Sequence, residues 1–124
     1  MTIASHPRHR SALLVGELAA ATGVSTRVLR YYEEQGLLCP ERSSTDYRLY
    51  PPDAVQTVRQ IRGLLDAGFS TVQIRALLPC ARGDAPEIEL CPQVAALMRE
   101  TLQRMDSAAA RLDEQRTRVR ALLD

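Results

Sequence analysis

The sequence lacks features that several large classes of protein require. It contains no tryptophan, no lysine and one phenylalanine, and its three cysteines form no CxxC pair. No apolar run approaches the ~20 residues of a membrane-spanning helix. The N-terminal MTIASHPRHRSA has no apolar core behind its positive charge, as a signal peptide would have. We therefore expect a cytoplasmic chain that contacts no membrane and keeps its cysteines as thiols.

The residue sets of common enzymes are missing as well. There is no Ser/His/Asp arrangement and no phosphate-binding loop, and both histidines, His6 and His9, lie in the N-terminal arm. We expect neither an enzyme nor a bound cofactor, and the residues specify no definite metal site.

Length and charge set further bounds. A chain of 124 residues accommodates one domain with a modest core, and 45% hydrophobic with 25% charged residues is typical of a soluble, largely helical protein. All sixteen basic residues are arginine, yet the formal net charge is only +1. Net charge alone does not indicate a nucleic-acid binder, so any basic surface must be local.

Two short helices joined at a glycine follow a loose arm over residues 1–12. GELAAAT at 16–22 predicts a helix that ends at Gly23, and Ser25 or Thr26 caps a second helix that runs through Gln35. This arrangement predicts a helix-turn-helix. Small or apolar residues stand where that motif needs internal contacts: Ala19, Gly23, Val24, Leu29 and Tyr32, with Leu18 and Val28 adding to the core.

The second helix then carries Arg27, Arg30 and Tyr31 on its outward face, the face that enters the major groove in such motifs. Arginine can bind phosphate or guanine, and a tyrosine hydroxyl can reach phosphate. The alternative is that Arg30 pairs with Glu33 or Glu34 on its own helix.

The remaining chain predicts a wing and three more helices. CPERSSTDYRLYPP alternates in the manner of a small β-hairpin. Pro52 suits the first turn of a third helix that extends to Gly68, and Ser70 with Gln73 forms a capping box for a fourth that ends at Pro79. We expect a domain over 13–79, a flexible connector over 80–91, and a long amphipathic helix over 92–124.

The long helix has an apolar stripe that little sequence remains to cover. We expect it to pair with a second copy as a coiled coil. The predicted dimerisation residues are Met98, Leu102, Met105, Ala109, Leu112, Val119 and Leu123.

VGELAAATGVSTRVLRYYEEQGLL, DYRLY and AGFSTVQIRALL, in this order, resemble the MerR family of transcription regulators from Leu14 to Leu78. The resemblance implies a mainly α fold, with an N-terminal winged helix-turn-helix followed by a C-terminal coiled-coil helix. It implies a homodimer that binds an inverted repeat in double-stranded promoter DNA and distorts the spacer for RNA polymerase. We assign the DNA contacts to Ser25, Thr26, Arg27, Arg30, Tyr31, Tyr47 and Arg48.

Asp46 departs from the family pattern, which has glycine before the wing Tyr-Arg pair. Asp tolerates left-handed backbone better than most residues, so we expect the wing to form. Tyr47 and Arg48 would then touch the DNA backbone, and whether Tyr50 belongs to the wing core is left open.

Cys80 and Cys91 lie eleven residues apart in the predicted connector. They are a candidate redox switch or half of a soft-metal site across a dimer, and Cys91 resembles the position of one mercury-binding cysteine of the family. The alternative is two packed thiols, which is also what we expect of Cys39. The competing function is an architectural or excisionase-like DNA-binding protein without an effector, although such proteins rarely need a long dimer helix.

Overall fold

The computed structural model describes residues 12–42 and 47–124. Most of the predicted N-terminal arm, and Asp46 in the predicted wing, lie outside the described residues. The chain divides into two compact units, Met1–Glu89 and Leu90–Asp124. The predicted fold class is confirmed, because helices form most of the described chain.

The first unit begins with the predicted helix-turn-helix, formed by α2 (Val15–Thr22) and α3 (Thr26–Glu34). Gly23 ends α2 with φ of 74°, in the left-handed region where a side chain is strained, and its N–H donates to the Ala19 carbonyl over 2.8 Å. Ser25 caps α3, because its Oγ accepts from the Val28 N–H at 3.2 Å. Gly23 and Ser25 thus fix the turn that orients α3 relative to α2.

A two-stranded wing follows, in which β1 (Glu41–Arg42) pairs antiparallel with β2 (Arg48–Leu49). The next residue, Tyr50, exchanges two backbone hydrogen bonds with Leu13, each of 2.8 Å. These bonds tie the wing to the segment that enters α2.

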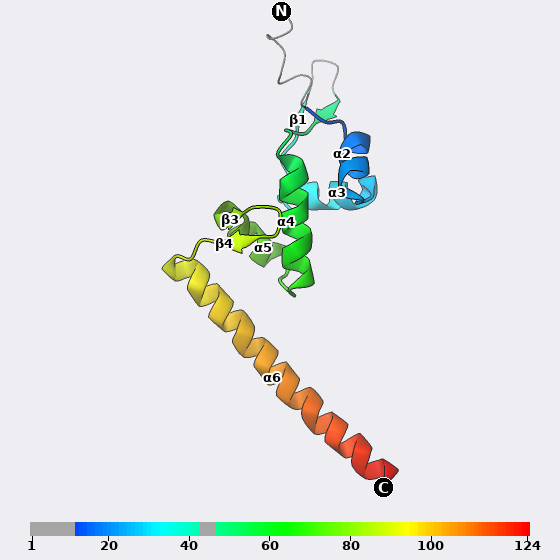
Figure 1. The fold of residues 1–124 in the computed structure, drawn as a ribbon, viewed down its shortest axis with the longest axis vertical. Helices are drawn as coiled ribbons and strands as arrows, with labels where there is room; N and C mark the ends of the chain where they lie inside the picture. The colour runs from blue at the N-terminus through cyan, green and yellow to red at the C-terminus, as the bar shows by residue number, and fades with distance from the viewer. Residues whose placement is uncertain (1–11, 43–46) are drawn as a thin grey trace, which may run out of the picture. The chain divides into compact units, whose positions relative to one another are not determined.

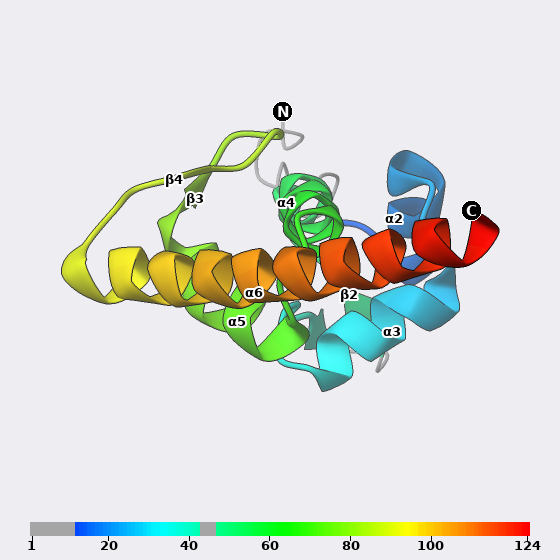
Figure 2. The same cartoon turned by 90° about the horizontal axis from the view of Figure 1, so that it is seen from below.

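Helix α4 (Ala54–Asp66) is the centre of this unit. Figures 1 and 2 show it between the α2–α3 pair and the segment that contains α5 (Thr71–Leu77). Pro52 was predicted in the first turn of this helix but lies in the turn before it, and α4 begins at Ala54. The side chains that are least exposed come from all of these elements: Leu18, Leu29, Tyr50, Val58, Ile61, Ile74 and Leu77.

The capping box predicted for the fourth helix is confirmed. The Ser70 Oγ accepts from the Gln73 N–H at 3.2 Å, and the Gln73 side chain accepts from the Ser70 N–H at 2.9 Å. A short 3-10 turn, Leu78–Cys80, continues from the end of α5.

The segment predicted as a flexible connector is instead a second hairpin, in which β3 (Ala81–Arg82) pairs with β4 (Glu87–Ile88). Its turn is held on α4: the buried Gln60 donates to the Gly83 carbonyl at 3.0 Å, and Arg59 pairs with Asp84 at 3.3 Å. Pro86 lies directly against Gly63. The sequence prediction was wrong because these contacts come from a helix more than twenty residues away.

The second unit contains the predicted long helix, α6 (Pro92–Leu123), of 32 residues. Glu100 and Arg104 form an i,i+4 ion pair at 3.4 Å. Of the predicted dimerisation residues, Met98 is half-buried and the other six are exposed in the single chain: Leu102, Met105, Ala109, Leu112, Val119 and Leu123. No helix in residues 12–42 and 47–124 combines the length and apolar character that a membrane crossing needs.

Candidate nucleic-acid interface

Helix α3 has one buried and one exposed face. Leu29 and Tyr32, three residues apart, are 0% and 3% exposed and pack into the core. Arg27, Arg30 and Tyr31 are exposed, as predicted. Val28 was expected in the core but is 38% exposed, because it lies outside the narrow stripe set by Leu29 and Tyr32.

The two arginines of this face are available to an external anion. Neither Arg27 nor Arg30 forms an ion pair within the described part of the chain. The alternative in which Arg30 pairs with Glu33 or Glu34 is therefore not realised. Ser25 and Thr26 precede them on the exposed N-terminal end of α3, with the Ser25 hydroxyl already engaged as the helix cap.

Glu33 instead binds the wing. Its Oε2 accepts from Arg48 Nε at 3.2 Å, and its Oε1 accepts from the Tyr50 hydroxyl at 3.0 Å. Tyr50 is 1% exposed, which resolves the open question in favour of the wing core. Burial, and then the hydrogen bond to Glu33, raise the pKa of Tyr50 to about 12.

The wing residues assigned to DNA differ in exposure. Tyr47 is 64% exposed, whereas the Arg48 side chain is 38% exposed and is held by Glu33. Arg48 lies on the surface of the wing, as predicted, but its pairing with Glu33 was not predicted. Glu33 is one of two adjacent glutamates, and only the position of the wing distinguishes it from Glu34.

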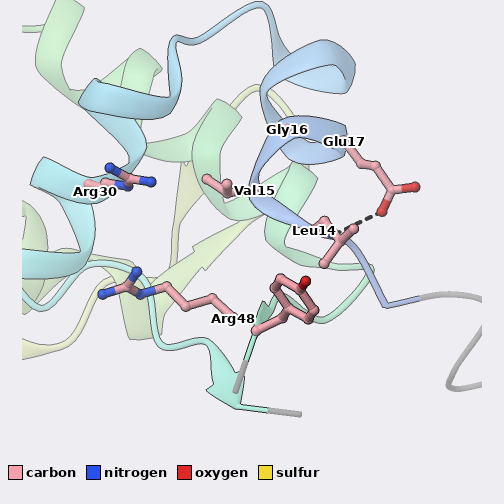
Figure 3. A pocket seen from close by; sticks show the side chains of 7 residues that line it. Leu14, Val15, Gly16, Glu17, Arg30 and Arg48 are labelled. Atoms are coloured by element: carbon pink, nitrogen blue, oxygen red, sulfur yellow. Dashed lines mark hydrogen bonds between the residues drawn. The ribbon is translucent and has the colours of Figure 1, made fainter. Parts of the chain in front are cut away.

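A cavity of about 520 Å³ lies between the start of α2, the exposed face of α3 and the wing. Figure 3 shows the Arg30 and Arg48 guanidinium groups projecting to the same side of it. On the α2 side, Glu17 turns back to accept from the Leu14 N–H at 2.8 Å. The lining residues are Leu14, Val15, Gly16, Glu17, Arg30, Tyr47 and Arg48.

This surface suits a polyanion rather than catalysis. Two guanidinium groups from separate elements converge on one cavity, and arginine binds phosphate through a planar fork of N–H donors. Arg27 continues the exposed basic face along α3. An exposed helix face of this kind beside a wing has the geometry of a major-groove binder.

The three cysteines differ in burial, and Cys39 differs from the prediction. Cys39 was expected to pack but is exposed, while Cys80 and Cys91 are half-buried thiols. The Cys80 carbonyl accepts from the Glu89 N–H at 2.9 Å, so the hairpin brings residue 89 beside residue 80. In the part of the chain that the structure describes, no three His, Cys, Asp or Glu side chains are grouped as a metal site.

Comparison with known families decides the identity. The model of the MerR HTH family regulatory proteins matches residues 13–80. The chain belongs to this family. MerR proteins are DNA-binding transcription regulators and not enzymes, which confirms the class expected from the sequence.

Relatives with curated descriptions support the MerR assignment. The chain is 40% identical over 103 residues to the nodulation protein NolA of Bradyrhizobium elkanii, covering 77% of this chain and 47% of that protein. It is 33% identical over 111 residues to the HTH-type transcriptional regulator ZntR of Escherichia coli K12, covering 89% of this chain and 77% of that protein. The chain thus spans less than half the length of the NolA protein.

Solved structures agree on the fold. A MerR family transcriptional regulator from Bacillus cereus superposes with a TM-score of 0.56 at 26% identity, over 82% of this chain and 74% of that one. HiNmlR, a MerR family regulator lacking the sensor domain and bound to promoter DNA, superposes with a TM-score of 0.55 at 19% identity, over 90% of this chain and 87% of that one. At that identity the second likeness establishes the fold alone.

Proposed function

We propose that this MerR protein binds an inverted repeat in double-stranded promoter DNA, with α3 in the major groove and the wing on the flanking backbone. The observation that carries the proposal is the convergence of Arg30 and Arg48 on one cavity beside the exposed face of α3. Arg27, Arg30 and Tyr31 would contact the groove and its phosphates, with Ser25 and Thr26 at the N-terminal end of the helix. Tyr47 and Arg48 would contact the backbone.

The active species is a homodimer formed through α6. Leu102, Leu112 and Val119 are each 57–58% exposed in the single chain, although they follow a heptad pattern with Met98 and Met105. A row of exposed apolar side chains on a helix of 32 residues is the kind of surface that a second copy covers in a coiled coil. Two copies would supply two recognition helices for the two halves of the repeat.

Regulation would act through DNA shape. At ~1.5 Å per residue, the 32 residues of α6 extend roughly 48 Å, longer than the ~34 Å of one DNA turn. An antiparallel pair of such helices would hold the two recognition helices apart, so both half-sites are bound when the spacer is bent or untwisted. RNA polymerase would use the distorted promoter. Cys80 and Cys91 are the candidate effector site, for an oxidant or a thiophilic metal.

The test begins with selection of bound duplexes from a random DNA pool, followed by fluorescence anisotropy titrations of the selected duplex. Arg27→Ala and Arg30→Ala should weaken binding while leaving the thermal melt nearly unchanged. Removal of an arginine that binds phosphate should lower the salt slope by about one. Removal of an arginine that binds guanine should instead relax the sequence preference by ~1–3 kcal/mol.

Arg99→Ala is the matched control, because it removes the same charge from an exposed position on α6 outside the predicted stripe. It should bind the duplex as the unchanged protein does. Failure to enrich any sequence would refute the proposal, as would equal affinities for all three arginine variants.

A further inference from the structure

Glu33 is an acidic residue inside a surface that we propose contacts a polyanion. Its side chain is only 25% exposed, and both of its carboxylate oxygens accept hydrogen bonds from the wing. Arg30 lies one helical turn before it on α3. A negative charge here repels DNA phosphate, so its presence needs a compensating role.

The wing side of this contact is held firmly. Tyr50 is fully buried and exchanges two backbone hydrogen bonds of 2.8 Å with Leu13. Its hydroxyl therefore presents a fixed donor to Glu33 Oε1, which leaves Oε2 oriented toward Arg48. The carboxylate is thus fixed by the wing core before it contacts the arginine.

The contact leaves most of the arginine free. Glu33 receives the Nε of Arg48, and the two Nη groups form no hydrogen bond to residues 12–42 or 47–124. Four N–H donors of the fork remain for a ligand. Figure 3 shows this guanidinium projecting to the same side of the cavity as that of Arg30.

We propose that Glu33 is a positioning residue that locks the wing to α3 and holds Arg48 beside Arg30, so that both guanidinium groups bind one backbone phosphate of duplex DNA. This inference rests on the proposed function and assigns Glu33 a role within it. The proposal requires that the free energy gained by fixing a flexible arginine exceed the repulsion between the carboxylate and the phosphate.

Two explanations of Glu33 predict opposite signs, which makes the proposal testable. If Glu33 positions Arg48, then Glu33→Gln should weaken binding of the selected duplex by roughly tenfold, because one charge-assisted phosphate contact is lost. The salt slope should fall by about one, as it should in Arg48→Ala. If Glu33 acts only as a negative charge, the same variant should bind more tightly.

Glu34→Gln is the matched control for charge. Glu34 is the adjacent residue on α3, it is exposed, and its side chain forms no hydrogen bond or ion pair within the described residues. Its substitution should leave binding unchanged or tighten it slightly. A double-mutant cycle supplies the second control: Glu33→Gln should cost nothing further when Arg48 is already alanine.

Tyr50→Phe keeps the buried ring and removes the hydroxyl that orients Glu33. It should weaken binding in the same direction, again only when Arg48 is present, and it tests the proposal if Glu33→Gln fails to fold. Tighter binding by Glu33→Gln, or an equal loss in the Arg48→Ala background, would overturn the inference while leaving DNA binding intact. An unchanged protein that binds no duplex would instead refute the proposed function, and this inference with it.

Discussion

Substitution of Gly63 in α4 tests how tightly the second hairpin is held. A Cβ added there would lie 2.9 Å from both Cγ and Cδ of Pro86, whereas carbon atoms in contact prefer ~3.5–4.0 Å. The proline ring cannot rotate away, so the hairpin turn must move by roughly 0.6–1 Å. That shift strains the hydrogen bond from the buried Gln60 to Gly83.

Two effects of opposite sign determine the result for Gly63→Ala. Replacing glycine inside a helix gains up to ~1 kcal/mol from helix propensity. Overpacking costs ~1–3 kcal/mol, and weakening a hydrogen bond to a buried side chain costs ~1–3 kcal/mol more. We expect a net loss of about 1–5 kcal/mol in the free energy of unfolding.

Gly16→Ala is the matched control, because an added Cβ at this helical position meets nothing within 4 Å. It should be neutral or stabilising by up to ~1 kcal/mol. The measurement is urea unfolding followed by circular dichroism, at one protomer concentration because the stability of a dimer depends on concentration.

Removal of the Pro86 ring should rescue the variant. Pro86→Ala removes both of the crowded atoms, so Gly63→Ala should cost little in that background. A Gly63→Ala protein as stable as Gly16→Ala, or one equally destabilised with and without Pro86, would show that the hairpin is not packed on α4 as described.

Three further predictions concern the dimer, the buried tyrosine and the thiols. Leu112→Asp should be a monomer by light scattering and should lose duplex binding, because the charge would be buried without a partner in the dimer interface. Ser107→Asp is the control, because residue 107 is exposed and lies outside the predicted stripe. It should stay dimeric. The free energy of unfolding should fall as pH rises from about 10 through about 12, because the raised pKa of Tyr50 makes folding favour the neutral phenol, and Tyr50→Phe should reduce this fall. The chain has no lysine, so its alkaline titration involves mainly tyrosines and cysteines. Burial also raises the pKa of Tyr32, which adds to the fall in the same direction. The double variant Cys80→Ser, Cys91→Ser should abolish any response of promoter output to oxidant or thiophilic metal. An equal response in the unchanged protein and the double variant would place the effector site elsewhere.

Local chemistry was sufficient to predict the helices and the caps of α2, α3 and α5. Gly23, the Ser25 cap and the Ser70–Gln73 capping box depend on backbone conformation and on bonds within four residues, so their signals are complete in a short window of sequence. The buried stripe of α3 was recovered in part for the same reason. Val28 was misplaced because the width of a stripe depends on what packs against it.

Contacts between distant segments were decided only by the tertiary structure. Whether Glu33 or Glu34 binds the wing depends on where residues 48 and 50 lie in space, and nothing in the RYYEE sequence distinguishes the two acids. The second hairpin is similar, because its short strands gain order from Gln60 and Gly63 on α4 rather than from their own propensity. The sequence determined by itself the helices, their order and the arginines of the exposed face. The fold determined which carboxylate holds the wing, because a long-range ion pair requires a geometry that no local pattern encodes.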